Sequence, residues 1–466
     1  MRLMNRRAAM VAAAAMALAL LTTPPAALAQ AVAEPPPATA DVRALTDAYN
    51  ASGLALFRQL SGRPGNIVFS PLSVGTAMAM ALSGARGETE REMAGVLKER
   101  LDRPAMEAAN AALRSTLARY DKSGEAPKCP PGMSVAMQES GARCEMAVRP
   151  DAQCPFPAER SGERCVASGY RPPSARLLSA NALMLSHEGD LISADYAALL
   201  KDRYGAEIFT DAGLDEVNGW VKRKTEGKIE RILEQLDRTT AAVILNAVYF
   251  KAKWAMVFSK ASTANEAFNL PRQSRISVPT MHQRASYALA ARGDYRAIRL
   301  PYTVKDIGMV VVLPNEIDGL DAVTRVLDEA EWAQLVTALQ APDAVKMTDL
   351  ALPRFKASYG ASLVPQFQQA GMKLAFEEKL ADFSGMTGRP AGQPPLAIGS
   401  IMHRAVIEVM EDGTEAAAAT AVAVIAGAIA RPEPPQVFHI DHPFLFAIVD
   451  DASGAILFQG RIADPR

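Results

Sequence analysis

The stretch EDGTEAAAATAVAVIAGAIAR, residues 411–431, decides how the rest of this 466-residue chain is interpreted. It begins with an acidic turn around Gly413, continues through a run of alanines, and ends in small and β-branched apolar residues. A helix is one alternative, because alanine has the highest helix propensity. A membrane span is another, but the apolar part, residues 416–430, is shorter than the roughly 20 residues that a bilayer requires.

A β-strand with one small face explains the stretch better than a helix or a membrane span. Read at a period of two, Glu415 leads one row of side chains, and the other row is small or apolar throughout. That second row consists of Thr414, Ala416, Ala418, Thr420, Val422 and Val424. It contains no charge and no proline, so we expect that this segment can enter a packed interior as an added strand.

Composition predicts a chain with a large core. With 49% hydrophobic and 22% charged residues, the chain needs no metal ion or disulfide to fold, and no cofactor is expected. The formal net charge is −1, which gives no reason to expect nucleic acid as a partner. The basic cluster Lys222, Arg223 and Lys224 fits one solvated helix face.

The first 29 residues have the pattern of a secretory signal peptide. A basic start, MRLMNRR, precedes a short apolar run, and Ala27-Leu28-Ala29 then offers small residues for cleavage after Ala29. No cysteine directly follows, so a lipoprotein anchor is not expected. The mature chain is predicted to be secreted or periplasmic and free of the membrane. Residues 30–40 read as a proline-rich linker.

Residues 121–173 form a cysteine-rich insertion with an internal repeat. Its halves, CPPGMSVAMQESGARC and CPFPAERSGERC, both begin with Cys-Pro and end with Ser-Gly-x-Arg-Cys. In a secreted chain four cysteines imply disulfides with three pairings open, and the repeat favours Cys129 with Cys144 and Cys154 with Cys165. Zinc is the alternative, but the spacing contains no CxxC pair.

Hydrophobic periodicity predicts alternating helices and strands in the rest of the chain. Ser70 is placed to cap an Ala/Met-rich helix that follows a short strand ending before Pro71. Further helices are predicted at 41–60, 89–101, 104–120 and 193–204. Strands are predicted at 175–185, 242–254, 278–281, 298–302 and 309–314, with a C-terminal hairpin of 438–446 and 454–461.

Several of these segments resemble motifs of the serpins, a family of serine protease inhibitors, in the family's order. They are NIVFSPLS (66–73), VNGWV (217–221), TEGKI (225–229), AVILNAVYFKAKW (242–254), LPRF (352–355), FQQAGM (367–372), ADFSG (381–385), FHIDHPFLF (438–446) and GAILFQGR (454–461). The stretch at 411–431 resembles the hinge and reactive-centre loop. The resemblance covers residues 41–466 except the insertion, with Ala252 standing where glycine is usual.

The resemblance implies an α+β fold and a secreted, bacterial-type serpin. Helices would pack around three mainly antiparallel β-sheets in a single domain, residues 41–466, with an exposed loop at 411–435. The hinge would consist of Glu411, Gly413, Thr414, Glu415, Ala416, Ala417, Ala418, Ala419 and Thr420.

The scissile bond of such a loop would be Gly427–Ala428, about sixteen positions past Glu411. Its neighbours Ile425, Ala426 and Ile429 are small or apolar, which favours an elastase-like or subtilisin-like target. Arg431 keeps a trypsin-like target open.

The resemblance also implies a buried polar cluster where strands of the main sheet part, made of Ser70, Ser73, Asn246 and His403. Trp254 would belong to the core beside the insertion point. A serine with a histidine also suggests a nucleophile and base. However, the chain has no G-x-S-x-G, Walker, G-x-G-x-x-G or H-E-x-x-H motif, so we do not expect an enzyme. The spacing of His439, Asp441 and His442 is weak support for a metal site.

The function implied is that of a suicide substrate. A target serine protease would cut the loop and form an acyl-enzyme, and the loop would then insert as a strand and trap the protease covalently. The inhibitor would be a monomer without a catalytic group. The alternative is a non-inhibitory serpin that binds or scaffolds a partner through the cysteine-rich insertion.

Overall fold

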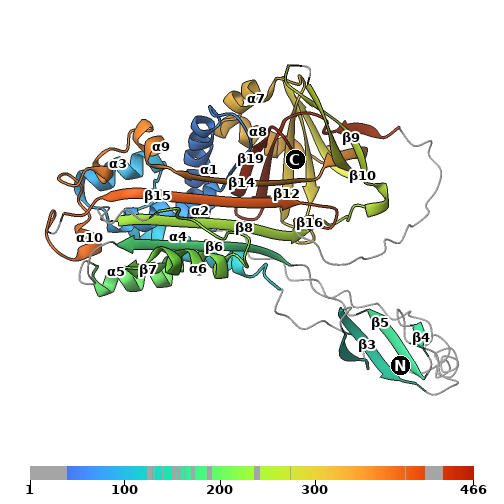
Figure 1. Ribbon diagram of the computed structural model, residues 1–466, viewed down its shortest axis with the longest axis horizontal. Helices are drawn as coiled ribbons and strands as arrows, with labels where there is room; N and C mark the ends of the chain where they lie inside the picture. The colour runs from blue at the N-terminus through green and yellow to red at the C-terminus, as the bar shows by residue number, and fades with distance from the viewer. Residues whose placement is uncertain are drawn as a thin grey trace, which may run out of the picture. The chain divides into compact units, whose positions relative to one another are not determined.

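A computed structural model describes residues 39–122, 129, 132–138, 141–148, 154, 159–161, 163–168, 174–185, 192–235, 242–272, 274–393, 395–414 and 434–466. The predicted signal peptide, nearly all of the linker, and loop residues 415–433 lie outside the described residues. In the described part, helices pack against two large β-sheets, as Figure 1 shows.

Five of the helices, α1, α2, α4, α5 and α8, begin at a residue whose side chain caps the helix. Ser70 takes the N-cap of α2, where its Oγ accepts from the backbone of Ser73, and Pro71 follows at the first helical position. The helix predicted at 89–101 is α3, which ends earlier because Lys98 adopts a left-handed conformation. No helix in the described part is long and apolar enough to cross a bilayer. The helices are α1 (Ala40–Leu60), α2 (Pro71–Gly84), α3 (Gly87–Leu97), α4 (Arg103–Ala118), α5 (Ala194–Leu199), η1 (Leu200–Tyr204), α6 (Leu214–Lys224), η2 (Lys260–Ser262), α7 (Leu320–Val326), α8 (Glu329–Leu339), α9 (Val364–Gln369), η3 (Leu374–Phe376) and α10 (Ser384–Thr387).

The six-stranded sheet has the order β14-β15-β8-β6-β7, and the short β16 also pairs with β8. Its central pair, β8 and β15, is parallel, whereas β6 is antiparallel to β8. Both faces of β8 are buried, one in the main core with α2 and the other under α6, which explains why its sequence is apolar on both faces. The strands are β6 (Ala175–Leu185), β7 (Glu207–Thr210), β8 (Ala242–Lys253), β14 (Phe355–Ser362), β15 (Ile398–Val409) and β16 (Gly413–Thr414).

The nine-stranded sheet has two parts joined by one long strand, β10. The end of β10 pairs with β11, while its earlier residues pair with β9 and β13. With the six-stranded sheet, these two parts make the three body sheets that the sequence predicts. The strands are β1 (Ile67–Phe69), β9 (Ala264–Leu270), β10 (Ser274–Arg292), β11 (Tyr295–Pro301), β12 (Ile307–Pro314), β13 (Val345–Pro353), β17 (Gln436–His439), β18 (Phe444–Asp450) and β19 (Ala455–Ile462).

The C-terminal hairpin differs from its prediction. Only β18 and β19 form it. The strand predicted at 438–446 is wrong, because the chain leaves the sheet after His439 and β17 pairs in parallel with β13 instead. Pro443, just before β18, has no backbone N–H to continue a ladder.

The insertion contains a small sheet of its own, with the order β2-β3-β5-β4. Its strands are β2 (Ser134–Gln138), β3 (Gly141–Ala147), β4 (Glu159–Ser161) and β5 (Arg164–Ser168). The disulfides are Cys129–Cys144 and Cys154–Cys165, the pairing favoured by the repeat. Each half of the repeat therefore carries one disulfide.

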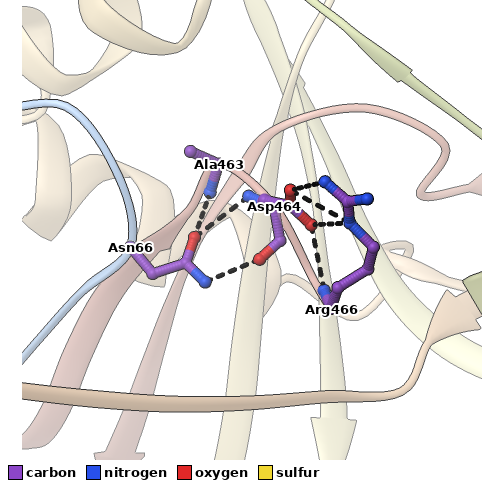
Figure 2. Close-up of polar contacts among 4 residues, drawn as sticks. All are labelled: Asn66, Ala463, Asp464 and Arg466. Carbon is purple, nitrogen blue, oxygen red and sulfur yellow. Dashed lines mark hydrogen bonds and ion pairs between the residues drawn. The ribbon is translucent and has the colours of Figure 1, made fainter. Parts of the chain in front are cut away.

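The last residues of the chain are tied to the start of β1 by Asn66 (Figure 2). Its Oδ1 accepts from the backbone nitrogens of Ala463, at 2.8 Å, and Asp464, at 3.0 Å. Its Nδ2 donates to the carbonyl of Asp464 at 2.6 Å. Arg466 in turn bonds the Asp464 carboxylate. These contacts hold β19 in place beside β1, and β19 packs against α2.

Candidate functional site

The two central strands of the six-stranded sheet part at one end. β8 and β15 are paired from Ala242 and Ile398 as far as Tyr249 and Val406. Beyond that point β16 lies next to β8, antiparallel to it, with Gly413 opposite Lys253 and Thr414 opposite Ala252 (Figure 1). The chain that leaves β15 therefore turns back and starts a new strand where β8 and β15 separate.

A two-residue turn makes this reversal. The backbones of Met410 and Gly413 exchange two hydrogen bonds, of 2.9 and 3.1 Å. Gly413 has φ of 135°, and a Cβ there would lie 2.3 Å from the carbonyl oxygen of Ala252. Both the conformation and the close approach require glycine.

Glu411 anchors the turn to the body. Its side chain is almost fully buried, and Oε1 accepts from Arg354 Nε at 2.8 Å and from Thr263 Oγ1 at 2.6 Å. Burial alone would raise the pKa of Glu411, but the hydrogen bonds from Arg354 and Thr263 hold it below its ordinary value. Its carboxylate is therefore charged and paired at neutral pH.

Thr414, the last described residue of the hinge, is fully buried and contacts the side chain of Tyr302. Its Oγ1 lies 2.9 Å from the hydroxyl of Tyr302. Tyr302 stacks on Trp254, with ring centroids 4.4 Å apart. Trp254 Nε1 donates to the carbonyl of Met410 at 2.9 Å. Trp254 thus lies in the core next to β16.

A row of polar side chains crosses the same sheet farther along. Asn181 of β6, Asn246 of β8 and His403 of β15 are register partners. Asn246 Nδ2 lies 2.5 Å from Asn181 Oδ1 and 2.6 Å from Ser73 Oγ, at the start of α2. Asn246 Oδ1 lies 2.6 Å from His403 Nδ1. These buried groups join β6, β8, β15 and α2 in one network.

His403 is neutral in this network. Burial lowers its pKa to about 3. Because Asn246 uses its NH₂ group toward Ser73, its oxygen accepts, and His403 carries its proton on Nδ1. In the described part of the chain Nε2 is buried without a hydrogen-bond partner. Ser70 instead donates to the carbonyl of Leu457 at 2.6 Å, and the His403 ring bonds Asn246, so Ser70 and His403 do not form a nucleophile–base pair.

Sequence reasoning missed several members of the site. Asn181 and Ser179, on β6, complete the polar cluster, with Ser179 Oγ 3.3 Å from Ser73 Oγ. Asn181 was detectable as a polar residue in a predicted buried strand. Arg354 lies in the quoted motif LPRF, but nothing in that motif points to Glu411 as its partner.

Other predicted residues lie outside the described part or show no site. The hinge residues Glu415–Thr420 and the bond Gly427–Ala428 are outside the described residues. Across the residues that are described, no group of three or more His, Cys, Asp or Glu side chains is arranged to hold a metal ion. Asp441 and His442 instead pair with each other at 2.8 Å.

Comparison with known proteins points to one family. A sequence model described as "Serpin (serine protease inhibitor)" matches residues 47–150 and 152–465. An uncharacterised serpin-like protein of Thermococcus kodakarensis is 32% identical over 429 residues, 91% of this chain and 86% of that protein. The leukocyte elastase inhibitor of Homo sapiens is 30% identical over 429 residues, 90% of this chain and 99% of that protein.

Solved structures show the same fold. The native state of Tengpin, a thermophilic serpin, has a TM-score of 0.70 at 23% identity and covers 90% of this chain and 94% of its own. Human glycosylated kallistatin has a TM-score of 0.71 at 22% identity, over 92% and 99% of the two chains. The chain therefore belongs to the serpin family, most of whose members inhibit proteases and are not enzymes.

Proposed function

We propose that this serpin inhibits serine proteases as a suicide substrate whose cleaved loop inserts between β8 and β15. The observation that carries the proposal is β16. Gly413 and Thr414 already pair with β8 at the end where β8 and β15 separate. The loop therefore begins at the mouth of the gap that it would fill.

The register of β16 supports insertion along the whole sheet. If the strand continued, each later loop residue would face a β8 residue one position earlier. Every second residue would then face the main core, as Thr414 does, opposite Ala252, Phe250, Val248, Asn246, Ile244 and Ala242. The loop residues at those positions are Ala416, Ala418, Thr420, Val422 and Val424 after Thr414. All are small or apolar, and Thr420 would bring a hydroxyl to the polar cluster at Asn246.

The length of the sheet also matches the position of the expected scissile bond. Val424 would face Ala242, the first residue of β8, so Gly427–Ala428 lies three residues beyond the end of the strand. Insertion over the 12 residues of β8, at ~3.3 Å per residue, would carry a bound protease roughly 40 Å. Complete insertion thus moves the acyl-enzyme to the opposite end of the sheet.

Insertion would release enough free energy to damage the protease. Roughly a dozen new backbone hydrogen bonds at ~0.5–1.5 kcal/mol each contribute on the order of 10 kcal/mol. That is comparable to the stability of a whole domain. If part of this free energy is spent on deforming the acyl-enzyme, it would distort the oxyanion hole of the protease and stop deacylation.

The residues around Gly427–Ala428 favour a protease with a shallow, apolar specificity pocket. Ile425, Ala426 and Ile429 are small or apolar. One human relative is named leukocyte elastase inhibitor. We therefore propose an elastase-like or subtilisin-like protease as the target. The alternative is a trypsin-like protease, which would cut after Arg431.

We place this activity outside the cytoplasm, as a monomer. The two disulfides support an oxidising compartment, and the first 29 residues support export.

The test is complex formation with elastase, subtilisin and trypsin. The expected result is an SDS-resistant complex with an elastase-like or subtilisin-like enzyme, and a released fragment beginning at Ala428. Ala418→Glu should be cleaved without trapping the protease, because insertion would force a charge into the core opposite Val248. Ala418→Ser, the matched control, should still trap. Cleavage of the wild type with full protease activity retained would contradict the proposal and favour a non-inhibitory serpin.

A further inference from the structure

Three exposed apolar side chains lie on the outward face of β13 and β17. Val345 is 56% exposed, Met347 49% and Val437 55%. Val437 pairs with Asp349 of β13. Met347 and Val345 lie two and four residues before Asp349, and alternate residues of a strand face the same side, so Val345, Met347 and Val437 share one face of the sheet. We call Val345, Met347 and Val437 the apolar ridge. The opposite face of these strands is core, as the buried Leu350 shows.

A hollow lies next to the ridge on the same face. Its volume is about 340 Å³, within the range of ligand pockets, and small residues, Ala351 and Thr280, are among those that line it. His439 is two residues past Val437 and borders the hollow. The carboxylates of Glu266 and Asp441 line its sides.

The polar groups of the hollow suit a side chain that donates hydrogen bonds. Glu266 and Asp441 can only accept when ionised. In the described part of the chain His439 Nε2 is buried without a partner. Glu266 already pairs with His282 at 2.9 Å. Asp441 pairs with His442 and also accepts from Asn269 Nδ2 at 3.2 Å, but each carboxylate has further lone pairs. An arginine or lysine side chain of a partner fits this lining.

The ridge lies close to where a target protease would dock. β17 is the direct continuation of the loop, and Val437 follows Ala428 by nine residues, at most about 30 Å of chain. Met347 lies next to the entry of β17, because its neighbour Thr348 pairs with Gln436. A protease domain of ~200 residues is on the order of 40 Å across. When the active-site cleft of the protease holds the loop, the surface of the protease around that cleft therefore lies near the ridge.

We propose that the ridge and the hollow form a second contact surface for the target protease. The ridge packs against an apolar rim of the protease, and the hollow takes one of its arginine or lysine side chains. The inference rests on the proposed function, because the loop brings the protease to this face. Such contacts stabilise the first, non-covalent complex and have no part in loop insertion. They raise the rate of association and leave the partition between trapping and cleavage unchanged.

The test is the double variant Met347→Ser, Val437→Thr, assayed with the protease that cuts the loop fastest. We expect the second-order rate constant for loop cleavage to fall about tenfold, which corresponds to ~1.4 kcal/mol. The stoichiometry of inhibition and the melting temperature should not change. The matched control is Leu380→Ser, an apolar residue 64% exposed near η3 and away from these strands. The protease should cleave the loop of the Leu380→Ser variant at the wild-type rate.

A second variant tests the hollow. Glu266→Gln should lower the rate constant and weaken its dependence on salt. Wild-type rates in both variants would overturn the proposal. So would a wild-type dimer in size-exclusion chromatography that the double variant converts to monomer, because the ridge would then bind a second copy. Loop cleavage is measurable without trapping, so a failure of the proposed function is seen separately in the missing SDS-resistant complex.

Discussion

His403 makes the stability of this serpin depend on pH. In the unfolded chain its imidazole binds a proton below about pH 6.5, whereas burial lowers its pKa in the folded chain to about 3. Between these values the unfolded state binds more protons, so the free energy of unfolding rises with pH. The contribution of neutral His403 is complete above about pH 6.5 and is lost as the pH falls toward 3.

The predicted loss is ~1.4 kcal/mol per pH unit, or about 2 kcal/mol between pH 6.5 and 5. His403→Gln removes the titrating ring and keeps an amide that can bond Asn246. Denaturant unfolding of both proteins from pH 8 to 5 measures the effect. The free energies of unfolding of the wild type and the His403→Gln variant should differ by a constant amount above pH 7, and the difference should shrink below pH 6. Parallel curves throughout would contradict the burial of a neutral His403.

Single residues of the site were predictable to different degrees. Ser70, Ser73, Asn246 and His403 were assigned to one cluster because they match positions that lie together in serpins. The resemblance does not cover partners fixed by packing. Arg354 reaches Glu411 across 57 positions of sequence, and Tyr302 reaches Thr414 across 112. Such pairs depend on how β13, β14 and β11 lie in the folded molecule, which local patterns do not encode.

At the scale of elements, strands with a strong pattern were predicted well. Residues 175–185 are β6, and residues 242–254 are β8 with one residue fewer. The short β17 was missed as a separate strand, because only the four residues IDHP, 440–443, separate it from β18. β16 has only two residues, too few for any period, and its position follows from the turn at Gly413.

The cysteine-rich insertion is expected to fold apart from the body. The chain enters and leaves it at adjacent points, since the nitrogen of Ala175 donates to the carbonyl of Tyr120 at 3.0 Å. Lys122 N also donates to Ser174 Oγ at 2.9 Å. Residues 123–173 can therefore be replaced by a short Gly-Ser turn without stretching the ends of α4 and β6.

We predict that this deletion changes the melting temperature of the body by less than about 3 °C and leaves protease trapping intact. Differential scanning calorimetry and SDS gels measure both. A reducing agent applied to the intact chain is the matched control, because it opens both disulfides and keeps the sequence. Loss of trapping after deletion would assign the insertion a direct part in inhibition.

At the scale of the whole molecule, the proposed mechanism requires a native state that is not the most stable one. β8 and β15 are paired along only part of their length, as far as Tyr249 and Val406. The network at Asn246 and His403 joins these two strands and must break and re-form when a strand enters. In the proposed mechanism, cutting the loop frees one of its ends, which can then enter the sheet between β8 and β15.

Thermal unfolding of intact and loop-cleaved protein tests this claim most directly. A gain on the order of 10 kcal/mol from a completed sheet should raise the melting temperature by at least about 10 °C after cleavage between Gly427 and Ala428. Equal melting temperatures for the two forms would show that the cleaved loop does not insert and would contradict the account.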